Sequence, residues 1–135
     1  MIALVREGAR ATMTISNPLK RNAMTLQMWQ ELTARMRECA GDEEIRVVVL
    51  RGDGGKAFVS GADIDGADIE HGAHGLQAYD AAISEAYRAV AECPHPVLAQ
   101  IDGYCIGGGL GLAVAADLRV CDEGSQFGIP AARSE

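Results

Sequence analysis

The fold is decided by one stretch of sequence, Gly103-Tyr104-Cys105-Ile106-Gly107-Gly108-Gly109-Leu110-Gly111-Leu112. It lies between an apolar, strand-like run at 96–101 and a helix-like run at 112–116. Three successive glycines there bring backbone N–H groups to a helix N-terminus, where the donors lack partners and the helix dipole is positive. Such a place suits a developing negative charge. The stretch therefore predicts an enzyme that holds an oxyanion.

Composition limits the kinds of partner this chain can have. Its 135 residues make one domain at most, or part of a larger one, and 48% of them are hydrophobic. A net charge of -7 argues against nucleic acid and anionic membranes as partners. The four cysteines show no metal-binding or redox spacing, and no segment resembles a signal peptide or a membrane span. We therefore expect a cytoplasmic protein with reduced thiols and no metal.

Hydrophobic periodicity predicts an α/β fold with no internal domain boundary, so that residues 1–135 form one unit. Thr25 can cap a helix that ends at Gly41, and the apolar run at 46–51 is typical of a parallel strand buried on both faces. We expect an extended-to-turn segment at 58–64, helices at 26–40, 74–92 and 112–116, and strands at 2–5, 11–15, 46–51, 97–101, 118–121 and 126–128.

Each of the two longer helices has an apolar face, which we interpret as core packing. The shared feature is helical spacing, seen in the first helix at Trp29, Leu32, Met36 and Cys39, and in the second at Tyr79, Ile83, Ala86, Tyr87 and Val90.

The glycine-rich stretch does not fit the common nucleotide-binding patterns. Gly107 and Gly109 lead to Leu112, and Gly109 and Gly111 lead to Val114, so both dinucleotide-binding frames fail. Gly55-Lys56 is followed by Ala57 and not by the Ser or Thr of a P-loop. Close packing of a helix on a strand, without any ligand, remains an alternative explanation for the three glycines.

A second motif, Ser60-Gly61-Ala62-Asp63-Ile64, gives the glycines a partner. A small residue after a glycine can present its backbone N–H to a cleft, and two N–H groups from distant loops form the usual oxyanion hole. Each motif is weak alone, but the pair in this order and spacing is specific.

With both motifs the sequence resembles the crotonase superfamily, the enoyl-CoA hydratase/isomerase group. The resemblance covers essentially the whole chain but only about the N-terminal half of a family member. It is carried by the segments 17–24, 47–50, 56–64 and 103–112, by Asp117 and by 126–130. It implies a spiral of ββα units, truncated here before the C-terminal helical region, so that residues 1–135 would be an incomplete crotonase-like core domain.

The resemblance also implies an acyl-CoA substrate and a site for it. The backbone N–H groups of Ala62 and Gly108 would form the oxyanion hole for the thioester carbonyl and its enolate. Coenzyme A would enter as part of the substrate, with no separate cofactor. Asp65 stands where many relatives have a lysine. The residues that would bind the substrate are Lys20, Arg21, Asn22, Ala23, Met24, Ala62, Asp63, Ile64, Asp65 and Gly108.

The chain departs from the family pattern at both acid/base positions. Hydratases of this family use two glutamates, and the matching positions here hold Gly111 and Ala131. A positioned acid or base contributes about 10²–10⁴-fold in rate, so hydration of a double bond is not expected. Three interpretations stay open: an acyl-CoA enzyme with another reaction, a catalytically inactive acyl-CoA-binding or assembly subunit, and a truncated fragment.

The resemblance generates a prediction about assembly. Family members are usually trimers, or dimers of trimers, with a trailing helical region. Without that region, apolar faces should be exposed on this chain, which should therefore form homo-oligomers or be marginally stable. Analytical ultracentrifugation combined with thermal unfolding checks this. A monomer with a high thermal midpoint would contradict it.

Overall fold

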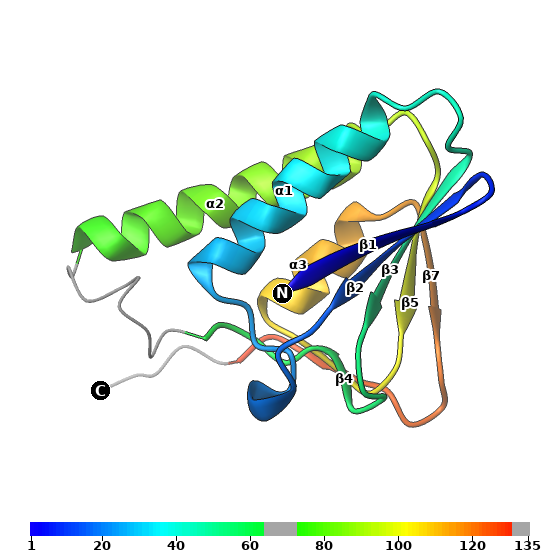
Figure 1. Cartoon of the computed structure of the whole chain (residues 1–135). Helices are drawn as coiled ribbons and strands as arrows, with labels where there is room; N and C mark the ends of the chain where they lie inside the picture. Colours follow the sequence, from blue (N-terminus) through cyan, green and yellow to red (C-terminus); the bar gives the residue numbers. More distant parts are fainter. Residues whose placement is uncertain (64–72, 131–135) are drawn as a thin grey trace.

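The computed structural model describes residues 1–63 and 73–130, with the side chains of 73 and 74 left aside (Figure 1). The described chain contains two sheets, three α-helices and one short 3₁₀ helix. In chain order, the elements are β1 (Ile2–Glu7), β2 (Arg10–Ile15), η1 (Pro18–Lys20), α1 (Leu26–Ala40), β3 (Val47–Gly52), β4 (Ala57–Val59), α2 (Ala73–Ala91), β5 (Val97–Ile101), β6 (Tyr104–Ile106), α3 (Gly108–Ala115), β7 (Leu118–Cys121) and β8 (Gln126–Gly128).

The strands repeat a two-sheet pattern along the chain. The larger sheet has the order β1-β2-β3-β5-β7 and the smaller one β4-β6-β8. Among the described strands, only the β1–β2 hairpin is antiparallel, and every other pair is parallel. Each turn thus adds one strand to each sheet and then a helix: β3-β4-α2, β5-β6-α3, and then β7-β8. This is the expected spiral of ββα units.

Helix α1 has the predicted bounds, for the predicted reasons. The Thr25 side chain accepts a hydrogen bond of 3.1 Å from the Met28 N–H, and the helix ends at Gly41. The four residues of its predicted apolar face are all buried. Figure 1 shows α1 and α2 side by side, and α2 also contacts α3. Helices from successive parts of the chain therefore share one core with the larger sheet.

The glycine-rich stretch differs from its prediction in two respects. We predicted a helix from Leu112, but α3 begins four residues earlier at Gly108, and a strand not predicted, β6, precedes it. Strand β6 forms because it pairs in parallel with β4 and β8, and these distant partners cannot be predicted from the local sequence pattern. The Gly107 N–H donates to the Gly128 carbonyl at 2.9 Å, which fixes the point where the helix starts.

The last strand of each sheet in the described chain has an exposed apolar face. Every residue of β7 is exposed, including Leu118 and Val120. Phe127 of β8 and the following Ile129 are exposed as well. Within the described residues, no helix is both long and apolar enough to cross a bilayer.

The buried thiol of Cys105 generates a prediction about alkaline stability. Burial raises the pKa of this thiol from 9.0 to about 11. At a pH between these two pKa values, the Cys105 thiol loses its proton in the unfolded chain but keeps it in the folded chain. The free energy of unfolding should therefore fall as the pH rises from 9 to 11. Urea denaturation across this range should show a shallower fall for Cys105→Ala than for the parent.

The exposed Cys121 supplies the matched control, Cys121→Ala. If the Cys121→Ala variant changed the pH dependence as much as Cys105→Ala does, the assignment to Cys105 would be wrong.

Candidate functional site

The candidate site is built from three segments that are far apart in the sequence and lie around the end of β4 and the start of α3. They are the turn at 17–24, the segment at 60–63 that follows β4, and the glycines at 107–109. A Cβ on Gly109 would lie 2.6 Å from the Cβ of Val59, so α3 packs directly on the end of β4. Close helix–strand packing, the ligand-free alternative, therefore explains Gly109. It leaves the backbone N–H of Gly108 to be accounted for.

The turn at 17–24 is held by the buried side chain of Asn22. Its carbonyl oxygen accepts from the Asn17 N–H at 2.9 Å, and its amide donates to the carbonyls of Asp53 at 3.0 Å and Ala57 at 2.8 Å. Arg21 and Asn22 have positive φ values of 52° and 62°. One buried amide therefore ties a strained turn to the loop before β4.

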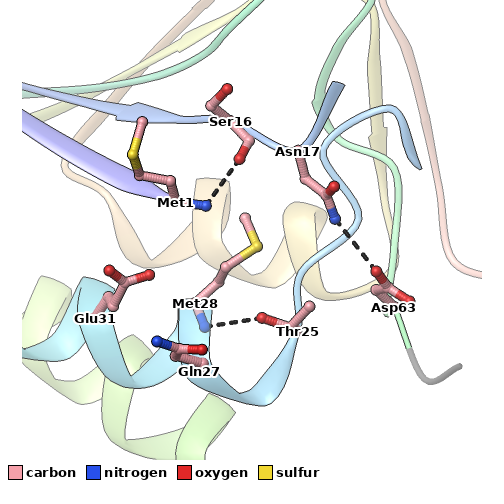
Figure 2. Close-up of a pocket in the computed structure, with 8 residues that line it drawn as sticks. All are labelled: Met1, Ser16, Asn17, Thr25, Gln27, Met28, Glu31 and Asp63. Atoms are coloured by element: carbon pink, nitrogen blue, oxygen red, sulfur yellow. Dashed lines mark hydrogen bonds between the residues drawn. The ribbon is translucent and has the colours of Figure 1, made fainter. Parts of the chain in front are cut away.

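Met24 connects this turn to the segment that contains Ala62. Its N–H donates to the Gly61 carbonyl at 2.9 Å, and its carbonyl accepts from the Asp63 N–H at 2.8 Å. The Asp63 carboxylate also accepts from the Asn17 side chain at 3.3 Å, as Figure 2 shows. Asp63 thus braces the loop, and Ala62 is exposed between two fixed neighbours.

Aromatic side chains from α1 and α2 join the two halves of the site. The Trp29 indole N–H donates to the Tyr79 hydroxyl at 2.9 Å, and that hydroxyl donates to the Met24 carbonyl at 2.6 Å. On its other side, the indole lies against α3, since a Cβ on Gly108 would be 2.9 Å from Trp29 Cζ2. Met24 and Gly108 are therefore fixed relative to the same indole.

The two predicted oxyanion-hole donors are available for hydrogen bonding in this arrangement. In the parts of the chain that the structure describes, neither the Ala62 N–H nor the Gly108 N–H has an acceptor. Gly108 is half-buried at the first position of α3, where a helix leaves its N–H groups without partners. The helix dipole there favours negative charge. Each of these two groups therefore has the capacity to donate to a further acceptor.

Basic side chains lie beside the turn. A cleft of about 160 Å³ there is lined by Pro18, Arg21, Asn22, Asp53, Gly54, Lys56 and Ala57. The Arg21 guanidinium lies 5.8 Å from the centre of the Tyr104 ring. Arg21 and Lys56 outnumber the one carboxylate of this small cleft, Asp53, and this excess of positive charge favours a phosphate-bearing group in spite of the overall acidity of the chain.

A second hollow, of about 380 Å³, lies between the start of α1 and the N-terminus (Figure 2). Two of its lining residues, Glu31 and Asp63, are acidic, and the Met1 ammonium donates to the Ser16 carbonyl at 2.8 Å. Its two carboxylates make it a poor site for an anionic ligand. Across the described ranges 1–63 and 73–130, no group of three His, Cys, Asp or Glu side chains could hold a metal ion.

The other predicted site residues are distributed as follows. Lys20 ends η1, and Ala23 is buried beside Met24. Ile64, Asp65 and Ala131 lie outside the described residues. Gly111 lies in α3 and faces the ring of Tyr87.

Sequence reasoning treated the aromatic residues only as core and missed their hydrogen bonds. The available signal was the placement of two tyrosines on a buried helix face, because a buried tyrosine hydroxyl needs a partner.

The fold and site together define the class. The two-sheet ββα spiral is the crotonase fold, and the family model for enoyl-CoA hydratase/isomerase proteins matches residues 6–134. The chain belongs to the enoyl-CoA hydratase/isomerase family.

Individual relatives differ in the reactions that their names describe. The chain is 33% identical over 132 residues to the mitochondrial 3-hydroxyisobutyryl-CoA hydrolase of Rattus norvegicus, with 96% of this chain and 34% of the relative covered. It is 34% identical to the mitochondrial Delta(3,5)-Delta(2,4)-dienoyl-CoA isomerase of the same species, with 84% and 37% covered.

Among solved structures, an enoyl-CoA hydratase/carnithine racemase from Magnetospirillum magneticum is 45% identical with a TM-score of 0.89. The match covers 96% of this chain and 49% of that protein. The chain thus spans between a third and a half of the length of these relatives.

The buried amide of Asn22 generates a prediction about the site's scaffold. Asn22→Ala leaves one buried N–H and two carbonyls without their partner, which should lower the free energy of unfolding by about 3 kcal/mol. Urea denaturation measures this, with Gln30→Ala on the exposed face of α1 as the control. Equal losses in the two variants would show that Asn22 does not hold the turn.

Proposed function

We propose that this chain binds an acyl-CoA thioester and stabilises a thioester enolate, with the Ala62 and Gly108 N–H groups as the oxyanion hole. Support comes from a single observation: both N–H groups lack an acceptor within the described chain, while the nearby N–H groups of Met24, Asp63 and Gly107 are bonded. Removing a proton or a carboxyl group next to the thioester carbonyl moves an electron pair onto its oxygen. Two fixed donors then bind that oxygen more strongly than they bound the neutral carbonyl.

The proposed path for coenzyme A runs along the turn at 20–24. Arg21 and Lys56 line the same small cleft, so that their positive charges are available for phosphate groups. The part of coenzyme A that leads to the thioester would then be positioned by Lys20, Asn22, Ala23, Met24 and Asp63. The same path would continue along Ile64 and Asp65. Coenzyme A is thus part of the substrate in this proposal, and no separate cofactor is required.

The proposed reaction does not require the pair of acid/base glutamates. Gly111 and Ala131 stand at the two positions where the family resemblance would place them. Decarboxylation or thioester hydrolysis with other groups fits the remaining donors better than addition of water to a double bond. The lack of a carboxylate at Gly111 also favours a second candidate, an inactive acyl-CoA-binding or assembly subunit. In both cases we propose a homo-oligomer, as a trimer or a dimer of trimers.

Binding and turnover measurements separate the candidates. Calorimetry with acetyl-CoA reports binding, and crotonyl-CoA and malonyl-CoA report hydration and decarboxylation. We expect binding and no hydration of crotonyl-CoA. Binding without turnover of any thioester would favour the inactive subunit, and the absence of binding would overturn both candidates.

The Gly108 N–H can be removed with a matched control. Gly108→Pro eliminates the donor, whereas Gly108→Ala adds a Cβ against Trp29 but retains the N–H. Loss of one oxyanion-hole donor costs about 10²–10³-fold in turnover, so Gly108→Pro should be slower than Gly108→Ala by that factor. Steady-state kinetics with the thioester that the parent consumes measures the ratio. Equal rates would exclude Gly108 from the hole.

A further inference from the structure

The space next to Gly111 is already filled by another side chain. A Cβ built on Gly111 would lie 2.2 Å from the hydroxyl oxygen of Tyr87, 2.5 Å from its Cζ and 2.9 Å from its Cε2. Non-bonded carbon atoms at best contact are about 3.5–4.0 Å apart. A side chain of any kind at position 111, including a carboxylate, therefore requires the Tyr87 ring to shift from this place.

Tyr87 is held in this place by specific contacts. Its hydroxyl donates to the Gly108 carbonyl at 2.9 Å. Its ring meets the Trp29 indole edge to face, with centroids 5.9 Å apart and planes at 88°. Burial, with a smaller contribution from Tyr79, raises the pKa of the Tyr87 phenol, so the group stays neutral and donates. The hydroxyl thus acts as a donor to the first residue of α3.

This hydrogen bond acts on the residue that carries the proposed donor. The Gly108 carbonyl is fixed by Tyr87, and Gly108 has no side chain of its own to limit its rotation. Holding the carbonyl restricts the orientation of the residue, and so of its N–H. The contact also completes a chain of side-chain contacts in which Tyr79 holds Met24, Tyr87 holds Gly108, and Trp29 lies between the two tyrosines.

We propose that Tyr87 and Gly111 form one unit, in which the phenol occupies the place of the missing acid/base side chain and positions Gly108. Tyr87 is then a positioning residue of the oxyanion hole. The role in the hole rests on the proposed function, whereas the pairing of Tyr87 with Gly111 does not. With this unit in place, the start of α3 offers the backbone N–H of Gly108 as a hydrogen-bond donor, and position 111 offers no side chain that could exchange a proton.

The pairing is tested by stability, without any ligand. Gly111→Ala should lower the midpoint of thermal unfolding, and this loss should be smaller in a Tyr87→Ala background than in the parent because the Cβ then has room. In a Tyr87→Phe background the loss should remain, since the ring carbon at 2.5 Å remains. Gly41→Ala is the control, because a Cβ there has no contact closer than 3.7 Å. Additive losses in Gly111→Ala/Tyr87→Ala would overturn the pairing.

The positioning role is tested with Tyr87→Phe, which keeps the ring and removes the hydroxyl. Because the Gly108 N–H is then less well oriented for the ligand, acetyl-CoA binding should weaken by up to about 5-fold in calorimetry, the factor that corresponds to the loss of one hydrogen bond. The amide resonance of Gly109, whose N–H shares a peptide group with the Gly108 carbonyl, should shift in the ¹H–¹⁵N spectrum. Thr33→Val is the matched control, because it removes a buried hydroxyl that donates to the Trp29 carbonyl within α1.

The two readouts keep the proposals apart. If the parent does not bind acetyl-CoA, the proposed function fails, and the Gly109 resonance still decides whether Tyr87 positions Gly108. If Tyr87→Phe leaves the Gly109 resonance unchanged, or weakens binding no more than Thr33→Val does, the positioning role is wrong.

Discussion

The contact between the Trp29 indole and its three neighbours is the constraint on which the site depends. Its N–H fixes the Tyr79 hydroxyl, which holds Met24, and its ring lies against both Gly108 and Tyr87. The segment at 60–63 and the glycines at 107–109 come from different turns of the spiral. Among the described contacts, no side-chain hydrogen bond joins them to each other. A rigid, nearly inaccessible aromatic side chain can set their separation, because close-packed interiors transmit small displacements.

The parallel sheets explain why these loops meet at all. Each turn of the spiral places one strand in each sheet, so the segments that follow corresponding strands are stacked beside one another. The segment after β4 and the start of α3 after β6 are neighbours for this reason, although more than 40 residues separate Ala62 from Gly108. The site is thus a product of the repeat, and its chemistry depends on which residues each turn supplies.

The sequence alone was sufficient for the elements with local signals. Thr25 and Gly41 marked α1, and the β-branched run at 47–50 marked β3. Sequence analysis missed β6 and the true start of α3, because glycines are poor helix formers and their helical state here comes from long-range pairing. The Tyr87–Gly111 contact has no local signal, since 24 positions separate its members. Predicting it requires knowing how α2 packs on α3.

In the described chain each sheet grows by one strand per turn of the spiral, and β7 and β8 are the last strands added. Each ββα turn is bonded mainly to the turn before it, so stability accumulates as a series of nearest-neighbour interfaces, much as in a stack. Strand β3 has partners on both sides, whereas β7 has a described partner only in β5. Protection of backbone amides from hydrogen exchange should therefore be greatest in the central strands of the larger sheet and lower at its two edge strands, β1 and β7.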